Sequence, residues 1–136
     1  MKLTDSVLSI TTTKIYSLTP SHTLLDVKHI FEKKSFHHHI PIMTEKKLVG
    51  MVSLIDFMRK IGNASLEDND PVYKSQVNEI MTLNPIKIND SKSIKEAIEK
   101  LVRQNVHALV VTDENNDVVG MLSTKDILQK ILLTSN

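Results

Sequence analysis

The chain has 136 residues, of which 40% are hydrophobic and 24% charged, as in a folded protein with a core rather than a disordered tail. Its 17 basic and 16 acidic residues give a net charge of +1, which excludes a long-range attraction to nucleic acid or to an acidic membrane. Cysteine is absent, which excludes disulfides, thiolate zinc sites and a cysteine nucleophile.

The N-terminal residues 1–5 lack the basic stretch and the apolar run of a signal peptide. No apolar run in the chain approaches the roughly 20 residues that a membrane-spanning helix needs. We therefore expect a cytoplasmic protein that does not enter a membrane.

The first half of the chain predicts a β-α-β-β-α unit that follows an apolar lead-in. An alternating strand at residues 15–18 precedes a helix that begins at a capping box formed by Thr23 and Asp26. An apolar run at residues 40–43, a polar turn and a second run that ends at residues 51–52 predict a β-hairpin.

The hairpin ends in the pattern Gly-x-x-Ser-x-x-Asp, in which Ser53 and Asp56 predict a second capping box and a second helix to residue 61. Residues 62–76 begin with a polar and acidic stretch that holds Gly62 and Pro71 and little that would enter a core. We interpret this stretch as a linker or a surface excursion, and assign residues 62–76 to the linker between the repeats.

The second half of the chain repeats the first. A strand at residues 86–88, a helix capped by Ser93 and Glu96, and a second hairpin lead to the same closing pattern, in which Ser123 and Asp126 match Ser53 and Asp56. The domain boundaries are therefore residues 1–61 for the first repeat, with its lead-in, and residues 77–136 for the second. The fold class is mixed α/β, of the α+β kind.

With these features the sequence resembles the CBS-repeat family, named after cystathionine β-synthase. The resemblance rests on residues 80–85 before a strand, on Ile40-Pro41-Ile42 in the middle strand, and on Gly-x-x-Ser-x-x-Asp at the end of both repeats. It implies two repeats packed as a pseudo-two-fold pair, with clefts for an adenosine-containing ligand such as AMP, ADP, ATP or S-adenosylmethionine. It also implies a homodimer that regulates an effector protein.

The resemblance implies that Asp56 and Asp126 accept hydrogen bonds from ribose hydroxyls, and that Ser53 and Ser123 contact ribose or phosphate. For the first repeat, the expected site residues are Ser53, Asp56, Thr12 and His39. For the second repeat, they are Ser123, Thr124, Lys125, Asp126, Thr82, Pro85, Ile86, His107, Ala108, Leu109 and Val110.

The Ser-x-x-Asp motifs have an alternative explanation that needs no ligand. Ser-x-x-Asp before an apolar run is a good helix cap in its own right, worth about 1 kcal/mol, so the motif can exist without a ligand.

The two repeats differ between the serine and the aspartate of this motif. Lys125 and Thr124 stand where the first repeat has Ile55 and Leu54, so the second repeat is the better candidate for a phosphorylated ligand. Lys125 is otherwise an ordinary solvated lysine.

Metal binding and catalysis are not expected. Consecutive strand residues point to opposite faces, so the three imidazoles of residues 37–39 cannot all converge on one ion. No nucleophile with a base and no Gly-rich phosphate loop is present in the sequence.

We therefore expect an adenine-nucleotide sensor that needs no cofactor and acts on a partner protein. Apolar residues of the second helices could form the interface, although core packing is the more common fate of such residues: Phe57, Met58, Leu128, Leu132 and Leu133. The alternative is a ligand-free module that serves only for interaction or dimerisation.

Overall fold

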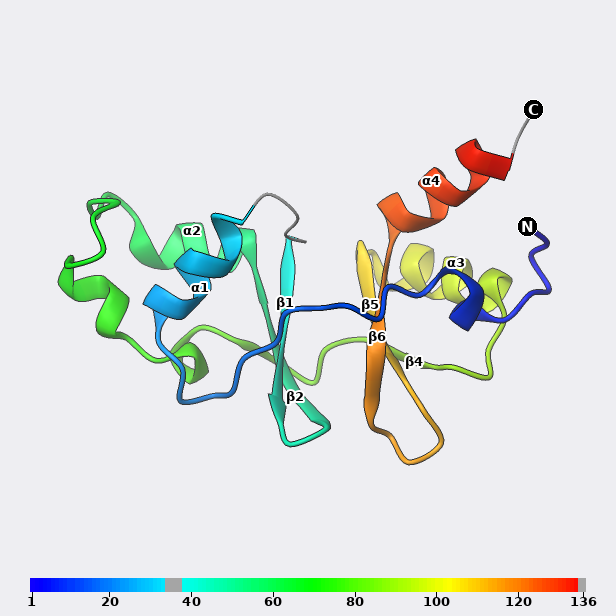
Figure 1. The fold of residues 1–136 in the computed structure, drawn as a ribbon, viewed down its shortest axis with the longest axis horizontal. Helices are drawn as coiled ribbons and strands as arrows, with labels where there is room; N and C mark the ends of the chain where they lie inside the picture. The colour runs from blue at the N-terminus through cyan, green and yellow to red at the C-terminus, as the bar shows by residue number, and fades with distance from the viewer. Residues whose placement is uncertain (34–37, 135–136) are drawn as a thin grey trace. The chain divides into compact units, whose positions relative to one another are not determined.

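The computed structural model describes residues 1–33 and 38–134, which form two compact units. We call Tyr16–Pro85 the first-repeat unit, and Met1–Ile15 together with Ile86–Asn136 the second-repeat unit. In the described part of the chain, each unit contains a three-stranded sheet and two α-helices (Figure 1). The predicted mixed α/β fold class is confirmed.

The first-repeat unit has a sheet in the order β1-β2-β3, with both neighbouring pairs antiparallel. Figure 1 shows α1 and α2 on the same side of this sheet. The core between them contains residues of both helices and both long strands, among them Leu24, Val27, Ile40, Ile42, Val52 and Phe57. The elements are α1 (Leu24–Phe31), β1 (His39–Thr44), β2 (Lys47–Ser53), α2 (Leu54–Ile61), η2 (Pro71–Lys74), η3 (Val77–Glu79) and β3 (Thr82–Leu83).

The second-repeat unit has a sheet in the order β4-β5-β6, in which β4 and β5 are parallel and β5 and β6 antiparallel. Its core is formed by side chains of α3, α4, the sheet and η1, among them Val7, Ile94, Ala97, Leu101, Leu122 and Ile127. The elements are η1 (Val7–Ile10), β4 (Lys87–Asn89), α3 (Ile94–Gln104), β5 (Ala108–Thr112), β6 (Val118–Ser123) and α4 (Thr124–Thr134).

The capping boxes predicted from the sequence are present at α1, α2 and α3. At α3, Ser93 Oγ accepts a hydrogen bond from the Glu96 N–H at 3.2 Å, and the Glu96 carboxylate accepts one from the Ser93 N–H at 2.8 Å. The backbone hydrogen bond from Ser93 lowers the pKa of Glu96, because it stabilises the ionised carboxylate. Such a cap therefore favours a charged acid at the start of a helix.

The first strand expected at residues 15–18 is reduced to a single bridge between Leu18 and Ile42. Leu18 exchanges hydrogen bonds with the Pro41 carbonyl and the Met43 N–H, at 3.2 and 2.8 Å. The next bond of a parallel ladder would need an N–H from Pro41, which proline lacks. In the second repeat the corresponding bond forms, from the Val110 N–H to the Ile86 carbonyl at 3.2 Å.

The two lead-ins are exchanged between the sequence repeats. Thr12, which precedes the first repeat, forms an antiparallel bridge with Met121 of β6, with two hydrogen bonds of 2.9 Å. Figure 1 traces this N-terminal segment in dark blue. Thr82, which precedes the second repeat, lies opposite Met51 of β2. Each sheet is thus completed or flanked by the lead-in of the other repeat.

Residues 62–76 are more than the linker that their composition predicts. Tyr73 in η2 is only 2% exposed and belongs to the core of the first-repeat unit, where Ala64 and Val72 pack against it. The Tyr73 hydroxyl donates a hydrogen bond to the Ser65 carbonyl at 2.8 Å. The part around Tyr73 is therefore packed into the first-repeat unit.

Within the described residues, the longest apolar helical stretch falls short of what a bilayer crossing requires.

Candidate functional site

The candidate site of the first-repeat unit lies where β2 ends and α2 begins. Ser53 Oγ accepts a hydrogen bond from the Asp56 N–H at 3.0 Å, and Asp56 Oδ2 accepts one from the Ser53 N–H at 3.0 Å. His39 lies opposite Ser53 across the β1–β2 pair, and Thr82 lies opposite Met51. The fold therefore brings His39 and Thr82 beside β2, the strand that leads into this cap.

The second-repeat unit repeats the arrangement between β6 and α4. Ser123 Oγ accepts from the Asp126 N–H at 3.1 Å, and Asp126 Oδ2 accepts from the Ser123 N–H at 2.8 Å. Ala108 lies opposite Ser123 in the β5–β6 pair, and Thr12 lies opposite Met121. The same strand-to-helix corner is therefore built twice.

Each of these caps uses only one oxygen of its aspartate. Among the described residues, Oδ1 of Asp56 and Oδ1 of Asp126 have no hydrogen-bond partner, and both side chains are partly buried. An ionised carboxylate offers two oxygens and about four lone pairs, all acceptors. The cap thus holds the side chain in place, and Oδ1 stays available to accept hydrogen bonds from a ligand.

The glycine of each Gly-x-x-Ser-x-x-Asp motif allows a lead-in to pass close to the strand. A Cβ atom at Gly120 would lie 2.3 Å from the Thr12 carbonyl oxygen, and one at Gly50 would lie 2.7 Å from Met81 Sδ. Neither glycine has a positive φ, so close approach rather than backbone conformation explains the residue type. The recurrence of these two glycines in register is the only signal in the sequence for this close approach.

The sequence-based assignment of the lead-ins to sites needs correction. Thr82 was grouped with Asp126, but it pairs with β2, which leads to Asp56. Thr12 was grouped with Asp56, but it pairs with β6, which leads to Asp126. Pro85 is the last residue of the first-repeat unit and likewise does not belong to the unit of Asp126. Ile86 does, since its carbonyl is bonded to β5.

Alternation along β5 divides its predicted contact residues between two faces. Leu109 is fully buried in the core of the second-repeat unit, so its side chain lies on the face of β5 that packs into this core. Ala108 and Val110 point to the opposite face, which they share with their strand partners Ser123 and Met121.

Thr124 and Lys125 occupy the first turn of α4. The Thr124 N–H donates to the His107 carbonyl at 2.9 Å, and the Thr124 hydroxyl reaches the same oxygen at 3.4 Å. The hydroxyl therefore already has a weak partner within the chain. The Lys125 side chain is exposed and makes no ion pair or hydrogen bond to the residues that the structure describes.

The strand register shows which histidines of the two repeats correspond. Leu54 donates its N–H to the His38 carbonyl at 2.8 Å, as Thr124 does to that of His107. His38 is therefore the counterpart of His107, a match that depends on the strand register and is not evident from the sequence. His39 corresponds to Ala108, because these residues lie opposite Ser53 and Ser123. His37, the first residue of the histidine run, lies outside the described residues.

Comparison with known proteins identifies both repeats. The model of the CBS domain matches residues 7–63 and 77–133. Uncharacterized protein MJ1232 of Methanocaldococcus jannaschii is 30% identical over 118 residues, which cover 87% of this chain and 36% of that protein. The chain likewise covers 41% of uncharacterized protein MJ1225 of the same organism, so it spans about two fifths of these curated relatives.

Two solved structures with the same fold are complexes with adenosine compounds. The CBS domain pair of protein MJ0100, in complex with 5′-methylthioadenosine and S-adenosyl-L-methionine, has a TM-score of 0.80 at 21% identity, over 96% of this chain and 98% of that one. CBSX2 in complex with AMP has a TM-score of 0.79 at 20% identity, over the same shares of the two chains. Two matched repeats across most of the sequence, together with this fold, show that the chain belongs to the CBS-domain family.

Proposed function

We propose that this chain is a regulatory module that binds an adenosine-containing ligand, such as AMP, ADP, ATP or S-adenosylmethionine, in the cytoplasm and is not itself an enzyme. The observation that carries the proposal is the duplicated corner at which Asp56 and Asp126 each keep one carboxylate oxygen available at a helix start. The ligands of the two solved CBS proteins, AMP and S-adenosyl-L-methionine with 5′-methylthioadenosine, support the choice of ligand class.

The chemistry of the corner suits a ribose. A vicinal diol has two O–H donors, and a carboxylate accepts from both without competing as a donor. A hydrogen bond to a charged group contributes about 1.5–3 kcal/mol. The backbone N–H groups in the first turn of α2 and α4 carry the positive end of the helix dipole, which favours a phosphate nearby.

The two sites differ in charge. The second-repeat site has the exposed Lys125 in the first turn of α4, where the first-repeat site has the exposed Ile55. We therefore assign phosphorylated ligands to the Asp126 site, and a less charged ligand to the Asp56 site. The alternative function, a ligand-free interaction module, predicts no binding at either aspartate.

Thermal unfolding with AMP, ADP, ATP and S-adenosylmethionine separates the two functions. A ligand at a hundred times its dissociation constant stabilises the protein by about 2.7 kcal/mol, which raises the melting temperature. We expect Asp126→Asn to abolish the rise caused by phosphorylated ligands, because the amide oxygen can keep the cap while the amide NH2 replaces the acceptor that faces the ligand. A module without ligands would show no rise.

Asp26→Asn is the matched control, since Asp26 caps α1 in the same way, accepting the Thr23 N–H at 3.0 Å, but lies outside both sites. It should leave the ligand-induced rise unchanged. If the rise survives in both Asp56→Ala and Asp126→Ala, the assignment of the sites is wrong.

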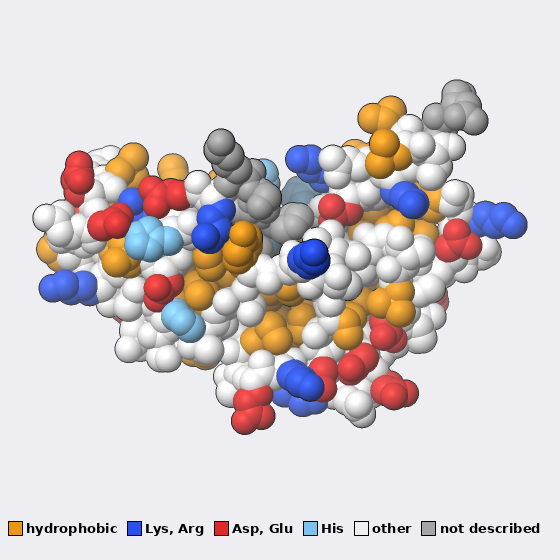
Figure 2. All heavy atoms as spheres, in the orientation of Figure 1, with side chains coloured by type: hydrophobic (Ala, Val, Ile, Leu, Met, Phe, Trp, Pro, Cys, Tyr) orange, Lys and Arg blue, Asp and Glu red, His pale blue; other side chains and the backbone are white. Residues whose placement is uncertain are grey.

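We further propose that the module forms a homodimer through α3 and α4, which carry most of the large exposed apolar side chains of the second-repeat unit. Leu128, Leu132 and Leu133 are 59%, 76% and 82% exposed, and Val102 of α3 is 74% exposed. A groove of about 520 Å³ lies between the two helices. Figure 2 shows apolar side chains on the surface of α4. Phe57, also expected at an interface, is instead buried at 5% exposure, whereas Met58 is exposed.

Light scattering after size exclusion tests the dimer. The wild-type chain should elute with the mass of two copies, and Leu128→Glu with the mass of one, because a buried carboxylate at the interface would have no partner. Lys95→Glu is the control, because Lys95 is an exposed residue of α3 that is not among the residues lining the groove. A monomeric wild-type chain would contradict this proposal without affecting the ligand sites.

A further inference from the structure

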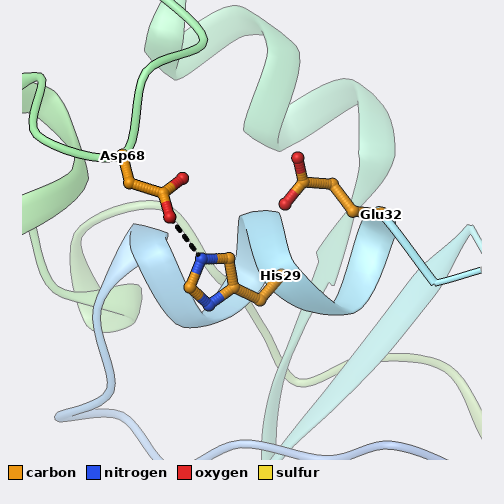
Figure 3. A group of neighbouring side chains, drawn as sticks. All are labelled: His29, Glu32 and Asp68. Atoms are coloured by element: carbon orange, nitrogen blue, oxygen red, sulfur yellow. Dashed lines mark hydrogen bonds and ion pairs between the residues drawn. The ribbon is translucent and has the colours of Figure 1, made fainter.

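Three potential metal ligands meet on the surface of the first-repeat unit. His29 lies in the last turn of α1, Glu32 is the residue that caps the C-terminal end of this helix, and Asp68 comes from the segment that follows α2. Figure 3 shows the three side chains converging, with His29 Nε2 and Asp68 Oδ2 2.9 Å apart. One donor atom from each residue lies within 4.8 Å of the other two.

A buried lysine, Lys28, contacts both carboxylates of this group. Lys28 Nζ donates to Asp68 Oδ1 at 2.7 Å and to Glu32 Oε2 at 3.1 Å, and its side chain is only 8% exposed. It also lies 5.7 Å from the centre of the Tyr73 ring. The ammonium group therefore binds the inner oxygen of Asp68, and the outer oxygen, Oδ2, faces His29.

We propose that His29, Glu32 and Asp68 bind a divalent first-row transition metal ion, such as Mn²⁺ or Zn²⁺. One imidazole nitrogen with two carboxylate oxygens is a donor set that these ions accept. The side chains of His29, Glu32 and Asp68 are 49%, 57% and 55% exposed, so water completes the coordination sphere. The metal links α1 to residues 62–70 and stabilises the first-repeat unit.

The geometry needs one small adjustment. Donor atoms about 2.0–2.2 Å from a metal are about 3–3.5 Å from one another, so the spacing of 2.9 Å between His29 and Asp68 already nearly fits. Glu32 must approach by a change of rotamer, which its exposure permits. The two carboxylates and the one ammonium group together carry a net negative charge, which attracts a metal cation. Repulsion by Lys28 weakens the binding of the metal without preventing it.

Titration of the full chain with Mn²⁺, followed by the loss of the free-ion signal in electron paramagnetic resonance, tests the site. We expect one ion per chain. Mutation of a residue that only hydrogen-bonds to a metal ligand lowers the affinity for the metal by about 10- to 100-fold. His29→Gln removes a ligand itself, so it should weaken Mn²⁺ binding at least about tenfold. Mn²⁺ is chosen because imidazole alone binds it less well than Zn²⁺, Ni²⁺ or Cu²⁺, so the histidine run at 37–39 contributes little.

His22→Gln is the matched control, because His22 is an exposed histidine whose Nδ1 accepts from the Thr19 N–H, away from the cluster. It should bind Mn²⁺ like the wild type. Lys28→Met should bind it more tightly, since the competing cation is gone, and a gain in affinity cannot come from misfolding. Absence of Mn²⁺ binding by the wild type, or equal affinity in His29→Gln, overturns the proposal, as does weaker binding by Lys28→Met.

Discussion

Gly120→Ala is expected to lower the free energy of unfolding by roughly 2–5 kcal/mol and to detach the N-terminal segment from β6. The added Cβ would lie 2.3 Å from the Thr12 carbonyl oxygen and 2.6 Å from Thr11 Cγ2. A backbone atom cannot move away without breaking the two 2.9 Å hydrogen bonds between Thr12 and Met121. Urea denaturation measures the loss in stability.

Hydrogen exchange shows where Gly120→Ala disrupts hydrogen bonds. The amides of Thr12 and Met121 donate the two bonds of this bridge, so both should exchange faster in the variant. Because Thr12 flanks the corner of Asp126, the variant should also lose the thermal stabilisation by phosphorylated ligands.

Gly50→Ala is the matched control at the equivalent position of the first repeat. There the Cβ would meet Met81 Sδ at 2.7 Å and the Thr82 carbonyl oxygen at 3.1 Å. A methionine side chain is flexible and can move, so we expect a cost of about 1 kcal/mol. If Gly50→Ala proved as destabilising as Gly120→Ala, contact with the backbone of the lead-in would not be the cause.

Local features of this fold could be predicted from the sequence because short-range chemistry determines them. The caps at Ser53 and Ser123 depend on a hydroxyl and a carboxylate three residues apart, a pattern that needs no information from distant segments. Duplication of the Gly-x-x-Ser-x-x-Asp pattern then indicated the repeated fold and the two candidate aspartates.

The strands with which the two lead-ins pair could not be predicted from the sequence. Nothing in the residues around Thr12 or Thr82 specifies which of two similar strand edges each will join, since β2 and β6 have nearly the same pattern. The shorter first strand of repeat 1 follows from Pro41, whose missing N–H interrupts the ladder. That effect was predictable only once the parallel register with Leu18 was known.

The packing of residues 62–76 into the core could not be predicted either, because the segment is mostly polar and only one large residue, Tyr73, is buried deeply. Tyr73 stacks with Phe57 at a ring distance of 6.3 Å, and Phe57 meets Phe31 edge to face at 5.7 Å. The segment thus contributes the third ring of an aromatic cluster that joins it to both helices of the first-repeat unit. Burial raises the pKa of Tyr73, whose neutral hydroxyl donates to the Ser65 carbonyl.

Tyr73→Ala should therefore cost about 3–5 kcal/mol of unfolding free energy, the range for removing a large buried aromatic side chain. Tyr73→Phe keeps the ring and loses only the hydrogen bond to Ser65, so it should cost about 0.5–1.5 kcal/mol. Urea denaturation followed by circular dichroism compares the two variants. A cost below about 1 kcal/mol for Tyr73→Ala would mean that residues 62–76 behave as the linker their composition predicts, because truncation of an exposed side chain changes stability by only about 0.5 kcal/mol.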